Sequence, residues 1–213
     1  MEIKVCGMRD SENIQEVLKE VVPDWMGLIF YPKSPRFVAE NFSTEISHLQ
    51  VKKVGVFVNA SNPTILEKIK RFDLSAVQLH GNESPEFVKE LRALTSIEIW
   101  KVVSVKEKID WKSLESYEQI VDRFLFDTAT SDYGGSGRKF DWDVLETYPF
   151  KIGFLLSGGI DEDSVDEIRN VSNKYPLMLG VDLNSRFEIR AAQKDSKKLK
   201  EFKKRLMGQG PIK

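Results

Sequence analysis

Residues 54–79 read VGVFVNASNPTILEKIKRFDLSAVQL, and this stretch contains one complete strand–helix–strand unit. Val54–Val58 and Ala76–Leu79 are short, mostly apolar runs without the regular polar alternation of a half-exposed strand. Such runs are typical of parallel strands that are buried on both faces. Between them, Pro63–Phe72 carries apolar residues at the spacing of one helical face. The stretch therefore predicts a β-strand, a covering helix and a second strand parallel to the first.

The same alternation extends along the whole chain. The other strands that we expect are Ile3–Cys6, Met26–Phe30, Glu98–Val103, Phe124–Phe126, Gly153–Leu156 and Met178–Val181. The other helices that we expect are Ser11–Val21, Pro85–Leu94, Ser164–Val171 and Asp195–Met207. Helical patterns are weakest after the second, fifth and sixth strands. Eight strands that alternate with helices imply parallel pairing and predict a (β/α)₈ TIM barrel, with an open doubly wound sheet as the alternative.

Composition limits how many domains the chain can form and which classes of partner it can bind. No linker or low-complexity tract divides the 213 residues, so we expect residues 1–213 to form a single barrel domain. The 32 Lys and Arg residues balance 33 Asp and Glu residues, so the cationic excess of a nucleic-acid binder is absent. The sequence has neither a signal-peptide core nor an uncharged apolar run of about 18 residues, which predicts a cytoplasmic protein without membrane contact.

The polar residues that follow the strands are the candidates for chemistry, because (β/α)₈ barrels carry their sites at the C-terminal strand ends. Cys6 is the only cysteine, which excludes an intrachain disulfide and a multi-cysteine zinc site. With only His48 and His80 available, we expect no histidine-rich metal site. His48 lies in a helix-like stretch and is interpreted as structural, whereas His80 ends the fourth strand and is placed to line the barrel mouth.

Two loops predict a phosphate site. Ser157-Gly158-Gly159-Ile160 follows the seventh strand and Asp182-Leu183-Asn184-Ser185 ends the eighth, which is where barrels bind phosphate. Glycines let backbone N–H groups approach phosphate oxygens, although alone they would serve equally well in tight turns. Gly134-Gly135-Ser136-Gly137 matches neither a P-loop nor a dinucleotide fingerprint and is interpreted as a loop that closes over a ligand.

A thiol and a carboxyl at two strand ends predict an acid–base pair. Most lone cysteines are buried hydrophobes, but Cys6 ends the first strand. Asp127 follows the apolar run Phe124–Phe126, so we expect its carboxyl to be partly desolvated and its pKa raised. Arg36, on a loop with two prolines, is placed to clamp a carboxylate. Arg9 or Arg36 is expected to lower the pKa of the Cys6 thiol.

An ordered set of motifs runs from the first strand to the last: KVCGMR at 4–9, GLIF at 27–30 with KSPR at 33–36, VGVFVN at 54–59, VQLHG at 77–81, Asp127 with GGSG at 134–137, LSGGI at 156–160, and GVD at 180–182 with Asn184-Ser185. By these motifs the chain resembles the phosphoribosylanthranilate isomerase family of tryptophan biosynthesis. The resemblance implies a (β/α)₈ barrel without cofactor or metal. It also implies an Amadori rearrangement of a small phosphorylated substrate, the aminoaldose N-(5-phosphoribosyl)anthranilate, to 1-(2-carboxyphenylamino)-1-deoxyribulose 5-phosphate.

The resemblance also implies residue roles. Asp127 resembles the general acid that protonates the furanose ring oxygen, and Cys6 the general base that removes the C2 proton of the resulting Schiff base. Arg36 resembles the residue that holds the anthranilate carboxylate. The other substrate-binding positions that we predict are His80, Gly135, Gly158, Gly159, Asp182, Asn184 and Ser185. One departure concerns the last loop, where Arg186 stands at the position of a family glycine.

Three other functions remain as alternatives. The sister isomerase of histidine biosynthesis resembles a design with two aspartates, so Cys6 counts against it. A metal-dependent phosphate-barrel epimerase would need histidines that are scarce in this chain. A non-catalytic phosphate-binding barrel is disfavoured because both Cys6 and Asp127 are present. For the assembly we expect a monomer, with a homodimer as the alternative.

Overall fold

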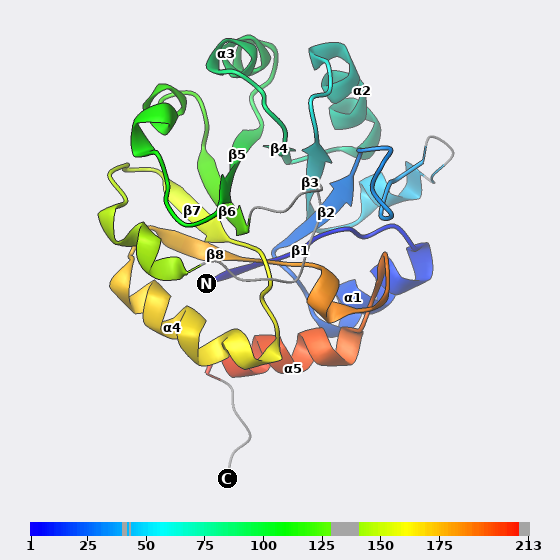
Figure 1. Cartoon of the computed structure of the whole chain (residues 1–213). Coiled ribbons are helices and arrows are strands. Elements are labelled where there is room, and N and C mark those ends of the chain that lie inside the picture. Colours follow the sequence, from blue (N-terminus) through cyan, green and yellow to red (C-terminus); the bar gives the residue numbers. More distant parts are fainter. Residues whose placement is uncertain (40–41, 43, 129–140, 209–213) are drawn as a thin grey trace.

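Eight parallel strands close into a barrel. The computed structural model describes residues 1–39, 42, 44–128 and 141–208. The strands follow one another around the barrel as β1 (Glu2–Val5), β2 (Trp25–Ile29), β3 (Lys52–Phe57), β4 (Ala76–Leu79), β5 (Glu98–Val105), β6 (Arg123–Thr128), β7 (Gly153–Leu156) and β8 (Met178–Leu183). β8 pairs back onto β1, from Glu2 opposite Gly180 to Val5 opposite Leu183. The predicted (β/α)₈ barrel is therefore confirmed, and the open sheet is excluded (Figure 1).

Among the described residues there are five α-helices, and Figure 1 shows them on the outside of the strands. They are α1 (Ser11–Glu20), α2 (Asn62–Phe72), α3 (Pro85–Leu94), α4 (Val165–Lys174) and α5 (Ser196–Leu206), close to the predicted ranges. Side-chain caps set several of their starts: Asp10 accepts from the amide of Asn13, and Ser84 accepts from the amide of Phe87. The caps satisfy amide groups that have no partner within the helix.

The connections after β2, β5 and β6 differ from the prediction. Where α-helices were expected, the described residues form the 3₁₀ helices η1 (Thr44–His48), η2 (Trp111–Tyr117) and η3 (Trp142–Thr147). The sequences of η2 and η3, WKSLESY and WDVLET, are rich in residues of weak helix propensity. Short 3₁₀ turns are sufficient to connect these strands, because hydrogen bonds from each strand to both of its neighbours hold the barrel together.

Two layers of apolar side chains make up the core, and strand alternation assigns residues to them. The interior of the barrel holds Trp25, Val54, Ala76, Trp100, Val102, Leu125 and Leu155. At its N-terminal end, the Arg123 guanidinium carbon lies 5.1 Å from the ring centre of Trp25 and 4.9 Å from that of Trp100. Arg123 also pairs with Glu98. The side chains of Trp25, Trp100 and Arg123 together fill the N-terminal end of the barrel, which leaves the C-terminal end for a ligand.

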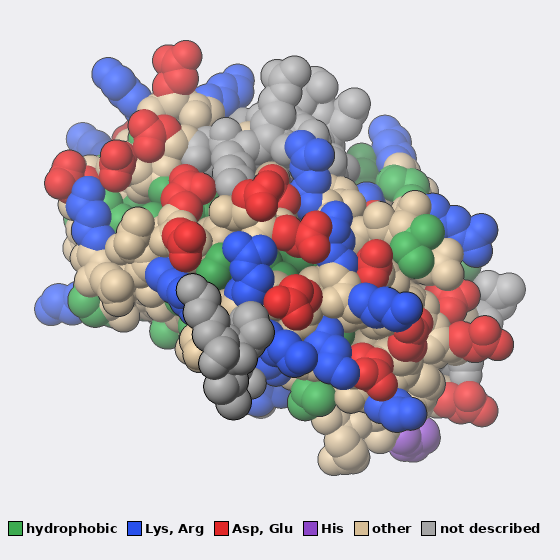
Figure 2. Space-filling view, turned by 90° about the horizontal axis from the view of Figure 1, so that it is seen from below, with side chains coloured by type: hydrophobic (Ala, Val, Ile, Leu, Met, Phe, Trp, Pro, Cys, Tyr) green, Lys and Arg blue, Asp and Glu red, His purple; other side chains and the backbone are tan. Residues whose placement is uncertain are grey.

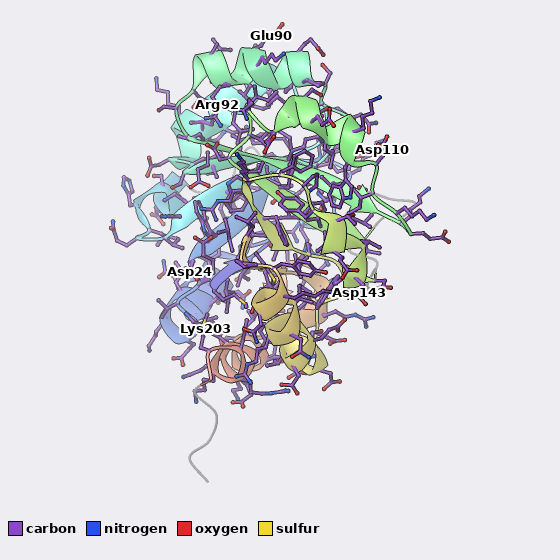
Figure 3. All side chains as sticks on the ribbon, turned by 90° about the vertical axis from the view of Figure 1, so that its left-hand side faces the viewer. Asp24, Glu90, Arg92, Asp110, Asp143 and Lys203 are labelled. Atoms are coloured by element: carbon purple, nitrogen blue, oxygen red, sulfur yellow. The ribbon has the colours of Figure 1, made fainter. Side chains whose placement is uncertain are left out.

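The outer surface carries charges of both signs. Lys and Arg are interspersed with Asp and Glu on the face seen in Figure 2, and Glu90, Asp110 and Asp143 lie at the periphery in Figure 3. On the face shown in Figure 2, the described residues therefore do not form the one-sided basic surface that phosphate backbones require. Among the described residues, no helix is long and apolar enough to cross a membrane.

A small hairpin follows β8 and was not predicted. The 3₁₀ helix η5 (Ser185–Phe187) leads into β9 (Glu188–Arg190), which pairs antiparallel with β10 (Gln193–Lys194). Phe187 is fully buried, with its ring centre 4.9 Å from that of Phe202 on α5, and this contact holds the hairpin against the barrel. As a result Glu188 contacts Arg36 and Lys194 contacts Asn184, two residues that line the pocket at the barrel mouth.

Candidate active site

One pocket occupies the C-terminal mouth of the barrel. Its polar lining is Cys6, Tyr31, Ser34, Arg36, Gln78, His80, Asp127, Ser157, Gly158, Gly159, Asp182, Asn184, Ser185 and Arg186, with apolar Ile29, Val56, Val58 and Ile160. Every predicted site residue in the described ranges lies in this lining. Gly135, with the rest of the GGSG segment, lies outside the described residues. His48 belongs to η1 and is not part of the lining.

The Cys6 thiol is buried at the end of β1 and packs against β2. A Cβ built on Gly27 would lie 2.8 Å from Cys6 Sγ, so a side chain at Gly27 would displace the thiol. Burial raises the pKa of Cys6, and the nearby ammonium of Lys4 partly opposes this rise. The thiol is therefore mostly protonated at neutral pH.

The cations that lower the pKa of Cys6 most are not the two predicted arginines, although Arg36 also interacts electrostatically with Cys6. Arg9 is exposed, and its guanidinium donates to the carbonyl of Pro35 at 3.1 Å. The groups that lower the pKa of Cys6 are Lys4 and then Lys194, both of which are buried. The sequence pattern missed them because Lys4 lies inside a strand and Lys194 lies in the unpredicted hairpin.

A buried ion pair joins β1 to β8 two residues before Cys6. Lys4 Nζ is 2.9 Å from Asp182 Oδ1, and both residues are almost completely buried. Burial alone lowers the pKa of Lys4, but Asp182 and Cys6 raise it above its ordinary value. The resemblance placed Asp182 on a phosphate loop. The residue instead lies within β8 and its carboxylate is held by Lys4, so it is part of the pocket floor.

Asp127, the next-to-last residue of β6, lies beside His80, which directly follows β4. Burial, with the charge of Asp182, raises the pKa of Asp127 from 3.8 to about 7. His80 Nε2 lies 3.5 Å from Asp127 Oδ2, and burial together with the cations Lys101 and Lys4 lowers the pKa of His80 to about 4. At neutral pH a neutral imidazole therefore stands beside a carboxyl that is about half protonated. A carboxyl in this state can donate a proton to a substrate.

Arg36 is fixed by the hairpin. Its Nε donates to Glu188 Oε1 at 2.9 Å and its Nη2 to Glu188 Oε2 at 2.6 Å. Lys194 Nζ donates to the same Oε1 at 2.6 Å and to Asn184 Oδ1 at 2.7 Å. The side edge of the guanidinium is thus occupied, and its Nη1–Nη2 edge is the one that a second carboxylate can use.

The charges of this network favour an anionic ligand. Burial alone would raise the pKa of Glu188, but Arg36 and Lys194 hold it below its ordinary value, so Glu188 is ionised at neutral pH. Burial lowers the pKa of Lys194 to about 8, which leaves it mostly charged at pH 7. Two cations therefore share one carboxylate, and a net positive charge remains at this side of the pocket.

The two predicted phosphate loops lie in the same pocket lining. Gly158 has φ +84°, and a Cβ built on it would lie 2.3 Å from Thr128 Oγ1 and 2.8 Å from Asp127 Oδ1. Only glycine therefore fits this close approach to the carboxyl. Arg186 belongs to the 3₁₀ helix η5 and lines the pocket, so the position of the family glycine carries a cation in this chain.

Metal ligation has no obvious set of donors in the described ranges. There, no three His, Cys, Asp or Glu side chains gather in a group that could hold a metal ion. The described lining offers a thiol and a carboxyl that can each exchange a proton with a ligand, together with cations and glycine loops for anionic groups.

Comparison with known proteins identifies the family. The profile of N-(5'phosphoribosyl)anthranilate (PRA) isomerase matches residues 3–205. The chain belongs to this family. The PRA isomerase of Parabacteroides distasonis is 45% identical over 206 residues, which cover 95% of this chain and 91% of the relative. The family predicted from the sequence motifs is thereby confirmed.

Solved PRA isomerase structures share the fold. The enzyme from Thermotoga maritima has a TM-score of 0.84 at 32% identity, covering 98% of this chain and 99% of that one. A PRA isomerase complexed with reduced 1-(o-carboxyphenylamino)-1-deoxyribulose 5-phosphate has a TM-score of 0.81 at 30% identity, with coverage of 98% and 99%. Monomers generated from the dimeric T. maritima enzyme match with a TM-score of 0.81 at 31% identity, again over 98% and 99%.

Proposed function

We propose that Cys6 and Asp127 are the general base and general acid of PRA isomerisation in this pocket. Membership of the PRA isomerase family gives the reaction, an aldose–ketose isomerisation in tryptophan biosynthesis. The observation that carries the assignment of roles is the presence, in one pocket, of a buried thiol and a carboxyl whose pKa is about 7. The pair supplies a proton donor for ring opening and an acceptor for the C2 proton.

The substrate binds across the pocket in a single orientation, with its phosphate on one side and its anthranilate ring on the other. Its phosphate is proposed to lie on Gly158, Gly159, Asn184 and Ser185, with Arg186 adding positive charge. Its anthranilate ring lies against Ile29, Val56 and Val58, with the carboxylate on the Nη1–Nη2 edge of Arg36. The sugar then lies between Cys6 and Asp127.

Ring opening is the first step. Protonated Asp127 donates its proton to the furanose ring oxygen as the C1–O bond breaks. The electron pair of the amine nitrogen forms the C1=N bond of a protonated Schiff base, and Asp127 becomes a carboxylate. The raised pKa matters here because an ordinary aspartate would be almost entirely ionised at pH 7.

Proton removal from C2 is the second step. The Cys6 thiolate takes the C2 proton, and the C–H electron pair moves into the conjugated system to give an enolamine. Protonation at C1 and loss of the C2 hydroxyl proton then yield the ketone. Although burial keeps Cys6 mostly protonated, Lys4 and Lys194 stabilise its thiolate. Because the Schiff base acidifies the C2 proton, a small thiolate fraction is sufficient.

The direct test is loss of substrate fluorescence when the purified protein meets freshly generated PRA in the presence of EDTA. Spontaneous breakdown to anthranilate is followed in parallel, and the released anthranilate is trapped. We expect decay far above this background and formation of the ketose. No rate above background from folded protein would overturn the proposal and direct the assay to the substrate of the sister enzyme.

The pH profile has a form set by the two pKa values. Asp127 must be protonated and Cys6 ionised, yet the pKa of Asp127 is about 7 and that of Cys6 is raised. The thiolate fraction rises with pH, whereas the protonated fraction of Asp127 falls above pH 7. We therefore expect kcat/KM to rise about tenfold per pH unit below pH 7 and to level off above it.

The same profile measured for Asp127→Asn isolates the carboxyl. The substrate phosphate is the same in both experiments, so its ionisation cannot cause a difference between the two pH profiles. The break at pH 7 should disappear in the variant, whose residual rate continues to rise with pH. A break that persists in the variant would assign it to a group other than Asp127.

Glu188 is expected to set the affinity for the substrate carboxylate through Arg36. In Glu188→Gln the charged partner of Arg36 and Lys194 is lost, so the guanidinium is no longer held in one plane. We expect KM to rise about tenfold with a smaller change in kcat, since Glu188 contacts the cations Arg36 and Lys194 rather than the reacting atoms. Steady-state kinetics measure this, with Glu162→Gln as the matched control.

Glu162 is a suitable control because it is a surface residue that pairs with Lys198 at 3.1 Å, so the change is chemically identical but lies outside the pocket. Equal effects on KM in the two variants, or a fall in kcat alone for Glu188→Gln, would contradict the positioning of Arg36 by Glu188.

The assembly and location of the chain also remain proposals. We infer a monomer, with the homodimer as the alternative that the dimeric T. maritima relative makes relevant. Light scattering distinguishes a mass of 24.5 kDa from twice that value. A cytoplasmic location and the lack of nucleic-acid and membrane partners stay predictions of the sequence.

A further inference from the structure

Gln78 is a polar residue of the pocket to which the reaction scheme gives no role. It lies on β4, where Val77 and Leu79 point outward into the core between strands and helices, while Ala76 points into the barrel. By strand alternation Gln78 shares the inner side with Ala76 and His80. Gln78 is only 2% exposed, and it lines the same pocket as Cys6 and Asp127.

In the part of the chain that the structure describes, no donor reaches the amide oxygen Oε1 of Gln78, although this atom is buried. A buried carbonyl oxygen without a hydrogen bond lowers the stability of a fold. Its register neighbour on β3 is Val56, an apolar residue, so packing alone would favour a similar residue at position 78.

The position of β4 indicates which part of the substrate the oxygen meets. β4 lies next to β3, whose residues line the proposed anthranilate subsite, and His80 at its end faces Asp127. The proposed phosphate subsite lies across the barrel on β7 and β8. The group opposite Gln78 is therefore the reacting end of the aminoaldose, which carries two hydrogen-bond donors, the amine N–H and the C2 hydroxyl.

We propose that Gln78 is a substrate-contacting residue whose Oε1 accepts a hydrogen bond from a donor at the reacting end of the aminoaldose. This inference rests on the proposed function and adds a contact that fixes the orientation of the sugar between Cys6 and Asp127. A pocket that offers a buried acceptor selects for a ligand with the matching donor, because an analogue without it leaves the acceptor unpaired.

The test uses Gln78→Met, which keeps the length of the side chain and removes the acceptor. We expect kcat/KM to fall about 10- to 100-fold, because the substrate donor loses its partner. The melting temperature should stay equal or rise, since the unpaired buried oxygen is gone. Val77→Ala is the control on the outer side of the same strand, and it should lower the melting temperature without changing kcat/KM.

Two results would overturn the inference. Unchanged kcat/KM in Gln78→Met means that the substrate does not use the oxygen. A lower melting temperature, or failure of both Gln78→Met and Gln78→Leu to fold, means that Gln78 serves the fold. The wild-type protein separates this inference from the proposed function: if it lacks isomerase activity both fail, whereas an active wild type with an active Gln78→Met removes only the inference.

Ligand binding then identifies the donor. The reduced product analogue carries both the amine N–H and a C2 hydroxyl, whereas the ketose product carries only the N–H at these positions. Gln78→Met should lose affinity for the analogue alone if the hydroxyl is the donor, and for both ligands if the N–H is. Calorimetric titration with each ligand measures this, and unchanged affinity for both would contradict the contact.

Discussion

Asp127→Asn is expected to lower kcat by about 10²- to 10⁴-fold while leaving the affinity for the product almost unchanged. Asparagine keeps the shape of the side chain but cannot donate a carboxylic proton to the ring oxygen, so ring opening loses its acid. Single-turnover fluorescence decay measures the rate, and calorimetric titration with the ketose product measures the affinity. Near-normal turnover in the variant would remove Asp127 from the role of acid.

The same variant has a predicted effect of opposite sign on stability. The pKa of Asp127 is raised from 3.8 to about 7 on folding. The folded state therefore holds the proton more tightly, and the stability that this contributes below pH 4 is lost as pH rises through about 7. The difference between the two pKa values corresponds to about 4 kcal/mol.

Asparagine carries no charge at either pH, so Asp127→Asn should melt at a higher temperature than the wild type at pH 8 and show a much smaller advantage at pH 4.5. Melting curves at the two pH values measure this, with Asp143→Asn as a control at an exposed carboxylate. A variant that is less stable than the wild type at pH 8 would mean that ionised Asp127 is well solvated, and that its pKa is not raised.

The barrel was predictable because its signals are local. Each strand is a short apolar run, and helices such as α3 begin with a serine cap followed by proline. The segments that were not predicted have no such signal. η2 and η3 lack a helical pattern, and the two strands of the β9–β10 hairpin are too short for alternation to show.

The site was predictable only in part, for the same reason. Cys6 and Asp127 follow apolar strands, so their positions at the mouth could be inferred from the chain itself. The partners that fix the site are distant in sequence: Arg36 and Glu188 are 152 residues apart, and Lys4 and Asp182 are 178 apart. Only closure of β8 onto β1 brings the second pair together.

Gln78 shows a third reason why part of the site could not be predicted from the sequence. Its motif was part of the family resemblance, but a glutamine in an apolar strand has no feature that separates a structural from a functional role. Burial and the unpaired oxygen, which only the fold reveals, make that distinction. A conflict between what packing favours and what the chain contains is expected where function sets the residue.

Cys6→Ser is expected to lower kcat by about 10³-fold or more, because a serine hydroxyl is a far weaker base than a thiolate. Cys6→Ala is the matched comparison, since it removes the group altogether. If Cys6 is the base, the two variants should be similarly slow; a normal rate for Ser with a low rate for Ala would indicate a packing role against Gly27.

Substrate deuterated at C2 assigns the affected step. With Cys6 replaced, removal of the C2 proton becomes rate-limiting, so a primary isotope effect should appear in single turnovers of Cys6→Ser. Asp127→Asn is slowed in ring opening, before the C–H bond breaks, and should show no such effect. An isotope effect in Asp127→Asn but not in Cys6→Ser would exchange the two roles, because the residue that slows C–H cleavage when replaced is the base.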